Sequence, residues 1–388
     1  MSLKMRKIGY ICATLNNYGS LLQSYALQEK VKENGFEPEI IRYKEPYLRI
    51  LLRMRDLELF KVTLKKILLS KVIGFKHTGL KVNLAKRAKA FEQFRKNNLV
   101  CPVVCKKRKQ LTNQAQKYPL VLLGSDQLWH PMNLKKDFFT LSFVPDNVKK
   151  VTYAASFGVS DIEKNKRSAY KTFLNRFDYI SCREKSGAQI VRDLTGKVAP
   201  VVCDPSLLMT AEDWTPMLSD RVKPEGKYIF CYFLGNNPQQ RGFVKMLKAK
   251  LNCQIVALPH IVEYVDSDEG YADLLPYNVG PAEFMYLIKN AEFVCTDSFH
   301  ASVFSLQFHK QFLVFDRFEN GKGHSTTSRI DTLLGVVKHP ERLIRNTSDG
   351  INHISEIQEI DYSKVDELLA EFRKESSEYL KTILSTIE

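Results

Sequence analysis

The chain has 388 residues and a formal charge of +15. One hydrophobic core stops growing at about 250–300 residues, so this length favours two domains. The sequence contains no run of about 18 apolar residues, which excludes a membrane-spanning helix. Its first five residues do not resemble a secretory signal, so we expect a cytoplasmic protein.

The cysteines do not predict a metal site. Most of the eight stand inside apolar runs, where a thiol behaves as a small core residue. The one close pair, Cys101 and Cys105, has no histidine at zinc-finger spacing. We therefore expect no bound metal.

The positive charge is concentrated in one segment. Between Arg42 and Lys109 there are 20 Lys or Arg against four Asp or Glu, which leaves the rest of the chain close to neutral. A nucleic-acid-binding domain would add a recognisable motif to such a surplus, so we do not expect nucleic acid as a partner.

The chain opens as a βαβ unit. Residues 6–14 form an apolar run typical of a strand, and a polar loop at residues 16–20 follows. A helical period starts at Leu21 and stops at Asn34-Gly35, after which residues 39–43 read as a second strand.

Residues 47–100 interrupt this pattern with basic, amphipathic sequence that predicts helices. Such a helix can lie on an anionic membrane surface. The commoner alternative is a helix whose apolar face packs on its own domain.

Strands then alternate with helices in two series. The first-half strands are predicted at residues 120–123, 151–156, 179–182 and 201–203. After a linker at residues 204–226, the second-half strands are predicted at residues 228–233, 254–258, 293–296 and 312–315. This alternation predicts an α/β protein with two Rossmann-like domains. The expected parts are a first domain of residues 5–210 with the insertion 47–100, a second domain of residues 211–345, and a helical segment of residues 346–388 that packs back on the first domain.

Ligands of open parallel sheets bind beyond the carboxyl ends of the strands. Four such ends carry small, polar or charged residues, at positions 17–20, 124–127, 183–186 and 296–300. Gly19 and Gly124 would let backbone amides approach an anion at a helix N-terminus, although an ordinary tight turn also favours glycine.

Two of these stretches resemble the polysaccharide pyruvyl transferase family. They are residues 17–27, Asn-Tyr-Gly-Ser-Leu-Leu-Gln-Ser-Tyr-Ala-Leu, and residues 124–129, Gly-Ser-Asp-Gln-Leu-Trp. The resemblance implies a glycosyltransferase-B-like fold with the active site in the interdomain cleft. It also implies a cytoplasmic enzyme that uses phosphoenolpyruvate as donor, needs no cofactor, and forms a pyruvate ketal on a glycan of an exopolysaccharide or capsule.

The family's arginine after the fourth strand matches Arg183, and its histidine at the start of a second-domain helix matches His300. Many members have arginine and leucine directly before that histidine, where this chain has Ser298 and Phe299. The missing charge would then come from Arg317, Lys322 or Arg329.

The chemistry of the donor favours the same residue types. Its carboxylate and phosphate need convergent cationic groups, and its methylene carbon must receive a proton. Histidine exchanges protons near neutrality, so we expect His300 to donate or relay this proton with Asp297 as its partner. The alternative is that these residues only cap a helix, and His309 and His324 are weaker candidates.

The residues expected to bind substrates share a place at a strand end or in the basic segment after the last strand. They are Arg183, Ser298, Arg317, Lys322, Arg329, Asn17, Tyr18, Gly19, Gly124, Ser125, Asp126 and Trp129. Tyr18, Trp129 and Phe157 could stack on sugar rings, although core packing is the commoner fate of aromatic residues.

Two other functions stay open from the residues alone. A nucleotide-sugar-dependent glycosyltransferase of the same fold would need an acidic residue for a ribose, for which Glu283 or Glu292 could be argued. A polyanion or membrane binder without catalysis would use residues 42–109. The expected partners of the enzyme are phosphoenolpyruvate, a glycan or lipid-linked glycan, and by peripheral contact an anionic membrane at its inner face.

Overall fold

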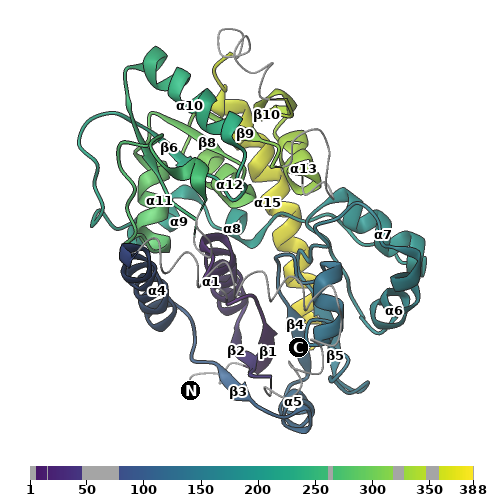
Figure 1. Ribbon diagram of the computed structural model, residues 1–388. Helices are drawn as coiled ribbons and strands as arrows, with labels where there is room; N and C mark the ends of the chain where they lie inside the picture. The colour runs from purple at the N-terminus through teal and green to yellow at the C-terminus, as the bar shows by residue number, and fades with distance from the viewer. Residues whose placement is uncertain are drawn as a thin grey trace.

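The computed structural model describes residues 6–14, 16–45, 78–260, 265–317, 327–346 and 358–387. Within them, two parallel five-stranded sheets lie in separate halves of the molecule (Figure 1). The predicted α/β class with two Rossmann-like domains is confirmed. No helix of these residues is both long and apolar enough to span a bilayer.

The first sheet has the strand order β3-β2-β1-β4-β5, all parallel. Its strands are β1 Arg6–Ile11, β2 Phe36–Tyr43, β3 Val103–Cys105, β4 Leu120–Leu123 and β5 Lys149–Thr152. The helices of this half are α1 Tyr18–Glu33, α4 Thr78–Asn98, α5 Arg108–Ala115, α6 Lys164–Asn175, α7 Lys185–Thr195 and α8 Pro205–Leu208. The chain switches sides between β1 and β4, which is where a doubly wound sheet binds its ligand.

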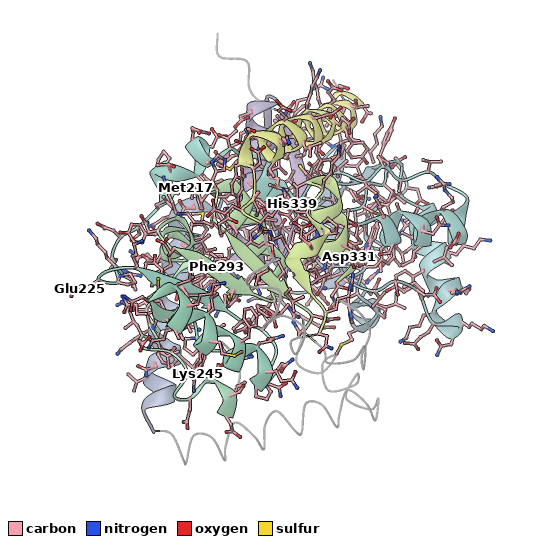
Figure 2. The ribbon with its side chains drawn as sticks, turned by 90° about the horizontal axis from the view of Figure 1, so that it is seen from above. Met217, Glu225, Lys245, Phe293, Asp331 and His339 are labelled. Carbon is pink, nitrogen blue, oxygen red and sulfur yellow. The ribbon has the colours of Figure 1, made fainter. Side chains whose placement is uncertain are left out.

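The second sheet has the order β10-β9-β8-β6-β7 and is also parallel. Its strands are β6 Tyr228–Tyr232, β7 Gln254–Ala257, β8 Phe293–Thr296, β9 Phe312–Phe315 and β10 Leu343–Ile344. The helices after α8 are α9 Ala211–Trp214, α10 Pro238–Leu251, α11 Pro281–Lys289, α12 Phe299–Gln307, α13 Ser328–Val336 and α15 Tyr362–Ser385. Figure 2 shows this half from above, with Lys245 of α10 at its outer margin and Phe293 nearer the middle.

The last two strands predicted for the first half are only single bridges. Tyr179 pairs with Val151, Cys182 with Ala155, and Val201 with Cys182. Side-chain oxygens of Thr152 and Ser181 accept hydrogen bonds here that a regular sheet would make between backbone groups. Ser181 N donates to Thr152 Oγ1 (2.9 Å), and Ala154 N donates to Ser181 Oγ (3.0 Å). β5 also ends early, since Ala154 adopts a left-handed φ of 54°.

Helix α15 joins the two halves (Figure 1). At its start Tyr362 donates to the carbonyl of Lys310 in the second half. Further along, Ser376 Oγ accepts from Cys203 N (2.9 Å) and Tyr379 donates to Thr152 O (3.2 Å) in the first half. The exact limits of the predicted domains stay a prediction.

Helix α4 is the described part of the basic insertion, and residues 47–77 lie outside the description. Its apolar side is buried, with Phe91 fully enclosed and Phe94 6% exposed. Lys86, Lys89 and Lys96 on its other side are exposed. The helix packs on α11 of the second domain, beside which it lies in Figure 1.

Candidate active site

The start of α1 forms one side of the candidate site. Asn17 caps this helix by accepting from Ser20 N (3.1 Å), so α1 begins three residues before the predicted start at Leu21. Gly19, in the first turn, packs against His300 so closely that a Cβ there would lie 2.0 Å from Nδ1 of the imidazole. This contact brings the N-termini of α1 and α12 together, and both carry partial positive charge.

His300 lies beside Asp204. The imidazole Nε2 is 3.5 Å from Asp204 Oδ2, and the His300 side chain is only 9% exposed. Among the described residues Nε2 makes no hydrogen bond. Asp204 is held in place by Ser206, whose N and Oγ donate to Oδ1 at 3.0 and 2.6 Å.

Asp204 also binds Arg183. Nη1 of the buried guanidinium donates to Asp204 Oδ2 at 2.6 Å, and Nη2 lies 3.9 Å from Asp126 Oδ1. Burial alone would raise the pKa of Asp204, but attraction to His300 and Arg183 holds it far below the usual range. The pKa of Asp126 is lowered by Arg183 and His300 against the effect of its burial. Both carboxylates are therefore ionised at neutral pH.

A second arginine lies on the opposite domain. The guanidinium carbons of Arg183 and Arg329 lie 4.6 and 5.8 Å from the ring centre of Phe299. Arg329 belongs to α13, and burial together with the charge of Arg183 lowers its pKa to about 9. These two buried cations repel each other, so a bound anion would stabilise the arrangement.

Several buried donors of this region make no hydrogen bond to any described part of the chain. They are Nε and Nη2 of Arg183, Nε2 of His300 and Nε of Arg317. Buried polar groups in proteins are nearly always satisfied, and leaving one unpaired costs about 1–3 kcal/mol. These donors come from both domains, and a ligand that is rich in acceptor oxygens would satisfy them.

Asp297 does not orient His300 as predicted. Its two carboxylate oxygens accept from the backbone of Leu234 and Gly235, each at 2.7 Å, and so hold the loop after β6. Asp204 takes the place beside His300 instead. Arg317 stays next to Asp297, donating from Nη2 to its carbonyl (3.2 Å). Ser298 caps α12, because its side chain accepts a hydrogen bond from Ala301 N (3.4 Å). This agrees with the alternative that the residues before His300 cap a helix.

The three aromatic residues considered for sugar stacking are buried in the core, which is the alternative that the sequence favoured. Tyr18 is fully buried against Phe284 (4.5 Å between ring centres) and donates to Val279 O, across the domain junction. Trp129, 2% exposed, donates to Phe139 O (3.1 Å), and Phe157 is also fully buried. Sequence alone could not tell these core positions from ligand positions.

Gly124 allows close packing, and its neighbour Ser125 makes a hydrogen bond to Asp204. A Cβ at Gly124 would lie 3.0 Å from the ring of Tyr10, so the small residue allows close packing inside the first domain. Ser125 is buried and donates to Asp204 Oδ2 (3.3 Å). Asp126 accepts from Ser20, which ties the end of β4 to the first turn of α1.

The remaining predicted residues fall outside the cluster or outside the description. Lys322 and His324 lie in residues that the structure does not describe. His309 is exposed and pairs with Asp366 (2.9 Å). Within the described ranges, no group of three or more His, Cys, Asp or Glu side chains could ligate a metal.

Asp204 is the central residue that sequence reasoning missed. It was assigned to the linker, although an aspartate directly after a strand and before Pro205 is typical of a helix N-cap. The same rule that selected the other strand ends would have selected it.

A family model covers residues 17–319 of this chain and is described as polysaccharide pyruvyl transferase. The chain belongs to this transferase family. The matched range includes Gly19, Asp126, Arg183 and His300, which the fold brings together. No curated protein sequence matches the chain significantly.

Solved structures share the fold at low identity. A UDP-N-acetylglucosamine 2-epimerase has a TM-score of 0.53 and 9% identity, covering 99% of this chain and 97% of its own. A protein from Listeria monocytogenes assigned to the same activity has a TM-score of 0.53 and 11% identity, covering 95% and 91%. The epimerase of Methanocaldococcus jannaschii has a TM-score of 0.50 and 10% identity, covering 98% and 99%. These likenesses establish the glycosyltransferase-B-like fold of this pyruvyl transferase family member.

Proposed function

We propose that the protein transfers pyruvate from phosphoenolpyruvate to two hydroxyls of a sugar, forming a ketal on a glycan or lipid-linked glycan. The observation that carries this proposal is the set of buried donor atoms on Arg183, His300 and Arg317 that make no hydrogen bond within the described residues. The donor's carboxylate and phosphate supply the acceptor oxygens that such groups lack. Membership of the family supports the same reaction.

The reaction needs proton transfer at carbon and at oxygen. A proton adds to the methylene carbon of phosphoenolpyruvate, and the first sugar hydroxyl bonds to C2 and loses its proton. The C2–O bond to phosphate then breaks as the second hydroxyl bonds to C2. The two hydroxyls release two protons in total. One balances the proton added to the new methyl group, and the other leaves with phosphate.

We assign the proton donor to His300, because its buried Nε2 makes no hydrogen bond within the described residues and the ring packs against Gly19. Asp204 is a positioning residue that stabilises the imidazolium, since it lies 3.5 Å away and stays ionised. Arg183 is the donor-binding cation. Because Asp204 already neutralises much of its charge, the N-termini of α1 and α12 and the side chain of Arg329 add the attraction that the anionic donor needs.

The test is the purified protein with phosphoenolpyruvate and a panel of glycans, with phosphate release and the pyruvate ketal measured by mass spectrometry. H300A should lower turnover by about two to four orders of magnitude, because it removes a proton-transfer group. H309A is the matched control and should retain wild-type turnover, since His309 is exposed and contacts Asp366 and the ring of Tyr362 on α15.

Unchanged phosphate release in H300A would show that the proton comes from another group. Consumption of a nucleotide sugar in place of phosphoenolpyruvate would instead support the glycosyltransferase alternative. The acidic residues considered for that alternative are engaged elsewhere, because Glu283 accepts from Gly280 N (2.8 Å) and Glu292 pairs with Lys227 (3.5 Å).

A further inference from the structure

A group of basic side chains gathers at the carboxyl edge of the first sheet, next to the candidate active site. We define this basic margin as Arg42, Lys44, Arg95, Lys106 and Lys107. Arg42 and Lys44 stand at the end of β2, and Lys106 and Lys107 follow the end of β3, while Arg95 comes from the last turn of α4. The strands are parallel, so their ends share an edge with the loops that carry Gly19 and Asp126.

Contacts place the margin beside the loop after β1. Nη1 of Arg95 donates to Asn16 Oδ1 at 2.6 Å, directly before the Asn17 cap of α1. Arg42 lies close enough to Cys12, at the end of β1, and to Arg95 to act on both electrostatically. Neighbouring strands lie about 4.8 Å apart, so about one strand spacing separates Arg42 from the loop that leads to Gly19 and His300.

The charges of the margin are not neutralised by the protein. Within the described parts of the chain, none of its five side chains forms an ion pair, and the adjacent acid Glu45 has a partner of its own. By contrast, Lys96 of α4 pairs with Glu92 (3.0 Å), and Arg108 at the start of α5 pairs with Asp137. Burial and the charge of Arg42 lower the pKa of Arg95, which indicates repulsion between the two arginines.

We propose that the basic margin binds an anionic group of the acceptor glycan, a phosphate ester or a uronate carboxylate, near the hydroxyls that receive pyruvate. This inference rests on the proposed function, which assigns the donor to Arg183 and His300. Two arginines next to each other suit a phosphate or carboxylate, because a guanidinium binds such groups through two hydrogen bonds. A neutral glycan would leave the repulsion between Arg42 and Arg95 in place.

The experiment is a glycan array with phosphorylated, uronate-containing and neutral members, probed with the full-length protein in the absence of phosphoenolpyruvate. R42Q/R95Q should bind the anionic members at least about tenfold more weakly than wild type. The matched control K164Q/K171Q loses the same charge from exposed positions on α6 and should bind as wild type. Separate phosphorylated and uronate members show which anion is preferred, and added salt should weaken binding to both.

Equal binding of neutral and anionic glycans by wild type, no binding of any member, or wild-type binding by R42Q/R95Q would each overturn the proposal. So would an equal loss in the control, or an equal loss of affinity for a DNA duplex in R42Q/R95Q, because either result indicates general attraction to polyanions. The array needs no turnover. Anion-selective binding without phosphate release would therefore contradict the proposed function alone. Phosphate release with neutral glycans only would contradict the proposed role of the basic margin alone.

Discussion

Asp204 connects the two groups to which the proposed chemistry assigns different tasks. One of its oxygens accepts from Arg183 and lies near His300, and the other is occupied by Ser206. A buried ion pair adds little net stability when intact, but removal of one partner leaves a buried charge uncompensated. The site thus depends on this carboxylate for the placement of both cations.

D204N should lower the free energy of unfolding by about 3–5 kcal/mol, because it leaves Arg183 buried without its anion. The folded pKa of Asp204 lies below its unfolded value of about 3.9, so its contribution is complete above about pH 5 and is lost as the solution is acidified. Urea unfolding between about pH 7 and pH 2 should therefore give a flatter pH profile for D204N than for wild type.

The control for this measurement is D220N at an exposed position, which should change the unfolding free energy by less than about 0.5 kcal/mol. Parallel pH profiles for wild type and D204N would contradict the electrostatic role of Asp204.

Gly19 is required because the imidazole of His300 occupies the space of a side chain. G19A should displace His300 and lower turnover about a hundredfold, since errors of about 1 Å in placement have effects of that size. G242A adds the same methyl group in the interior of α10, where a Cβ meets no atom within 4 Å. It should keep full activity and gain about 0.5–1 kcal/mol of stability. Steady-state kinetics of both variants test this, and normal turnover in G19A would rule out the close contact.

At the scale of elements, α4 connects the first domain to the second through buried contacts. Its Arg87 is 1% exposed and donates to the carbonyls of Pro259 and Pro276, while Phe91 packs on Tyr18 (4.8 Å between ring centres). Tyr18 in turn lies beside Gly19, so α4 supports the first turn of α1. The described end of the basic insertion is therefore part of the domain junction.

R87A should lower the free energy of unfolding by about 3 kcal/mol, because two buried carbonyls lose a charged donor. K86A, the exposed neighbour on the same helix, should change it by less than about 0.5 kcal/mol. Urea denaturation compares the two variants with wild type. Equal stability of R87A and K86A would mean that the carbonyls of Pro259 and Pro276 find other donors.

At the scale of the whole molecule, the candidate site is built from both domains and closed by helices that cross between them. The apolar core around Tyr18, Phe284 and Phe304 is continuous from one sheet to the other. Arg183 of the first domain and Arg329 of the second meet around Phe299. A ligand bound there contacts both halves and should stabilise them together.

Phosphoenolpyruvate at a hundred times its dissociation constant should raise the free energy of unfolding by about 2.7 kcal/mol. R183Q should lose most of this gain, because it removes the cation expected to bind the donor, whereas R192Q at an exposed position of α7 should keep it. Thermal unfolding with and without the ligand measures the effect. A larger shift with UDP than with phosphoenolpyruvate would favour the nucleotide-sugar alternative.

The sequence by itself determined the α/β class, most strands of the two series and the ends at which chemistry was expected. These features follow from local periodicity and from the rule that parallel strands share a carboxyl edge, neither of which needs knowledge of distant contacts. Strands β8 and β9 were predicted at their observed limits for this reason. The predicted ends at Gly19, Asp126, Arg183 and His300 do lie together, although their roles stay predictions.

Only the tertiary structure decided which residue is next to which. Asp204 and Asp297 both follow a strand and precede a helix, so their local sequence cannot show that one lies beside His300 and the other holds the loop after β6. Tyr18 and Trp129 likewise carry no local sign of burial, because their surroundings come from the other domain and from α6. Burial and pairing depend on how the two domains and their helices pack, and these are contacts between residues far apart in the chain.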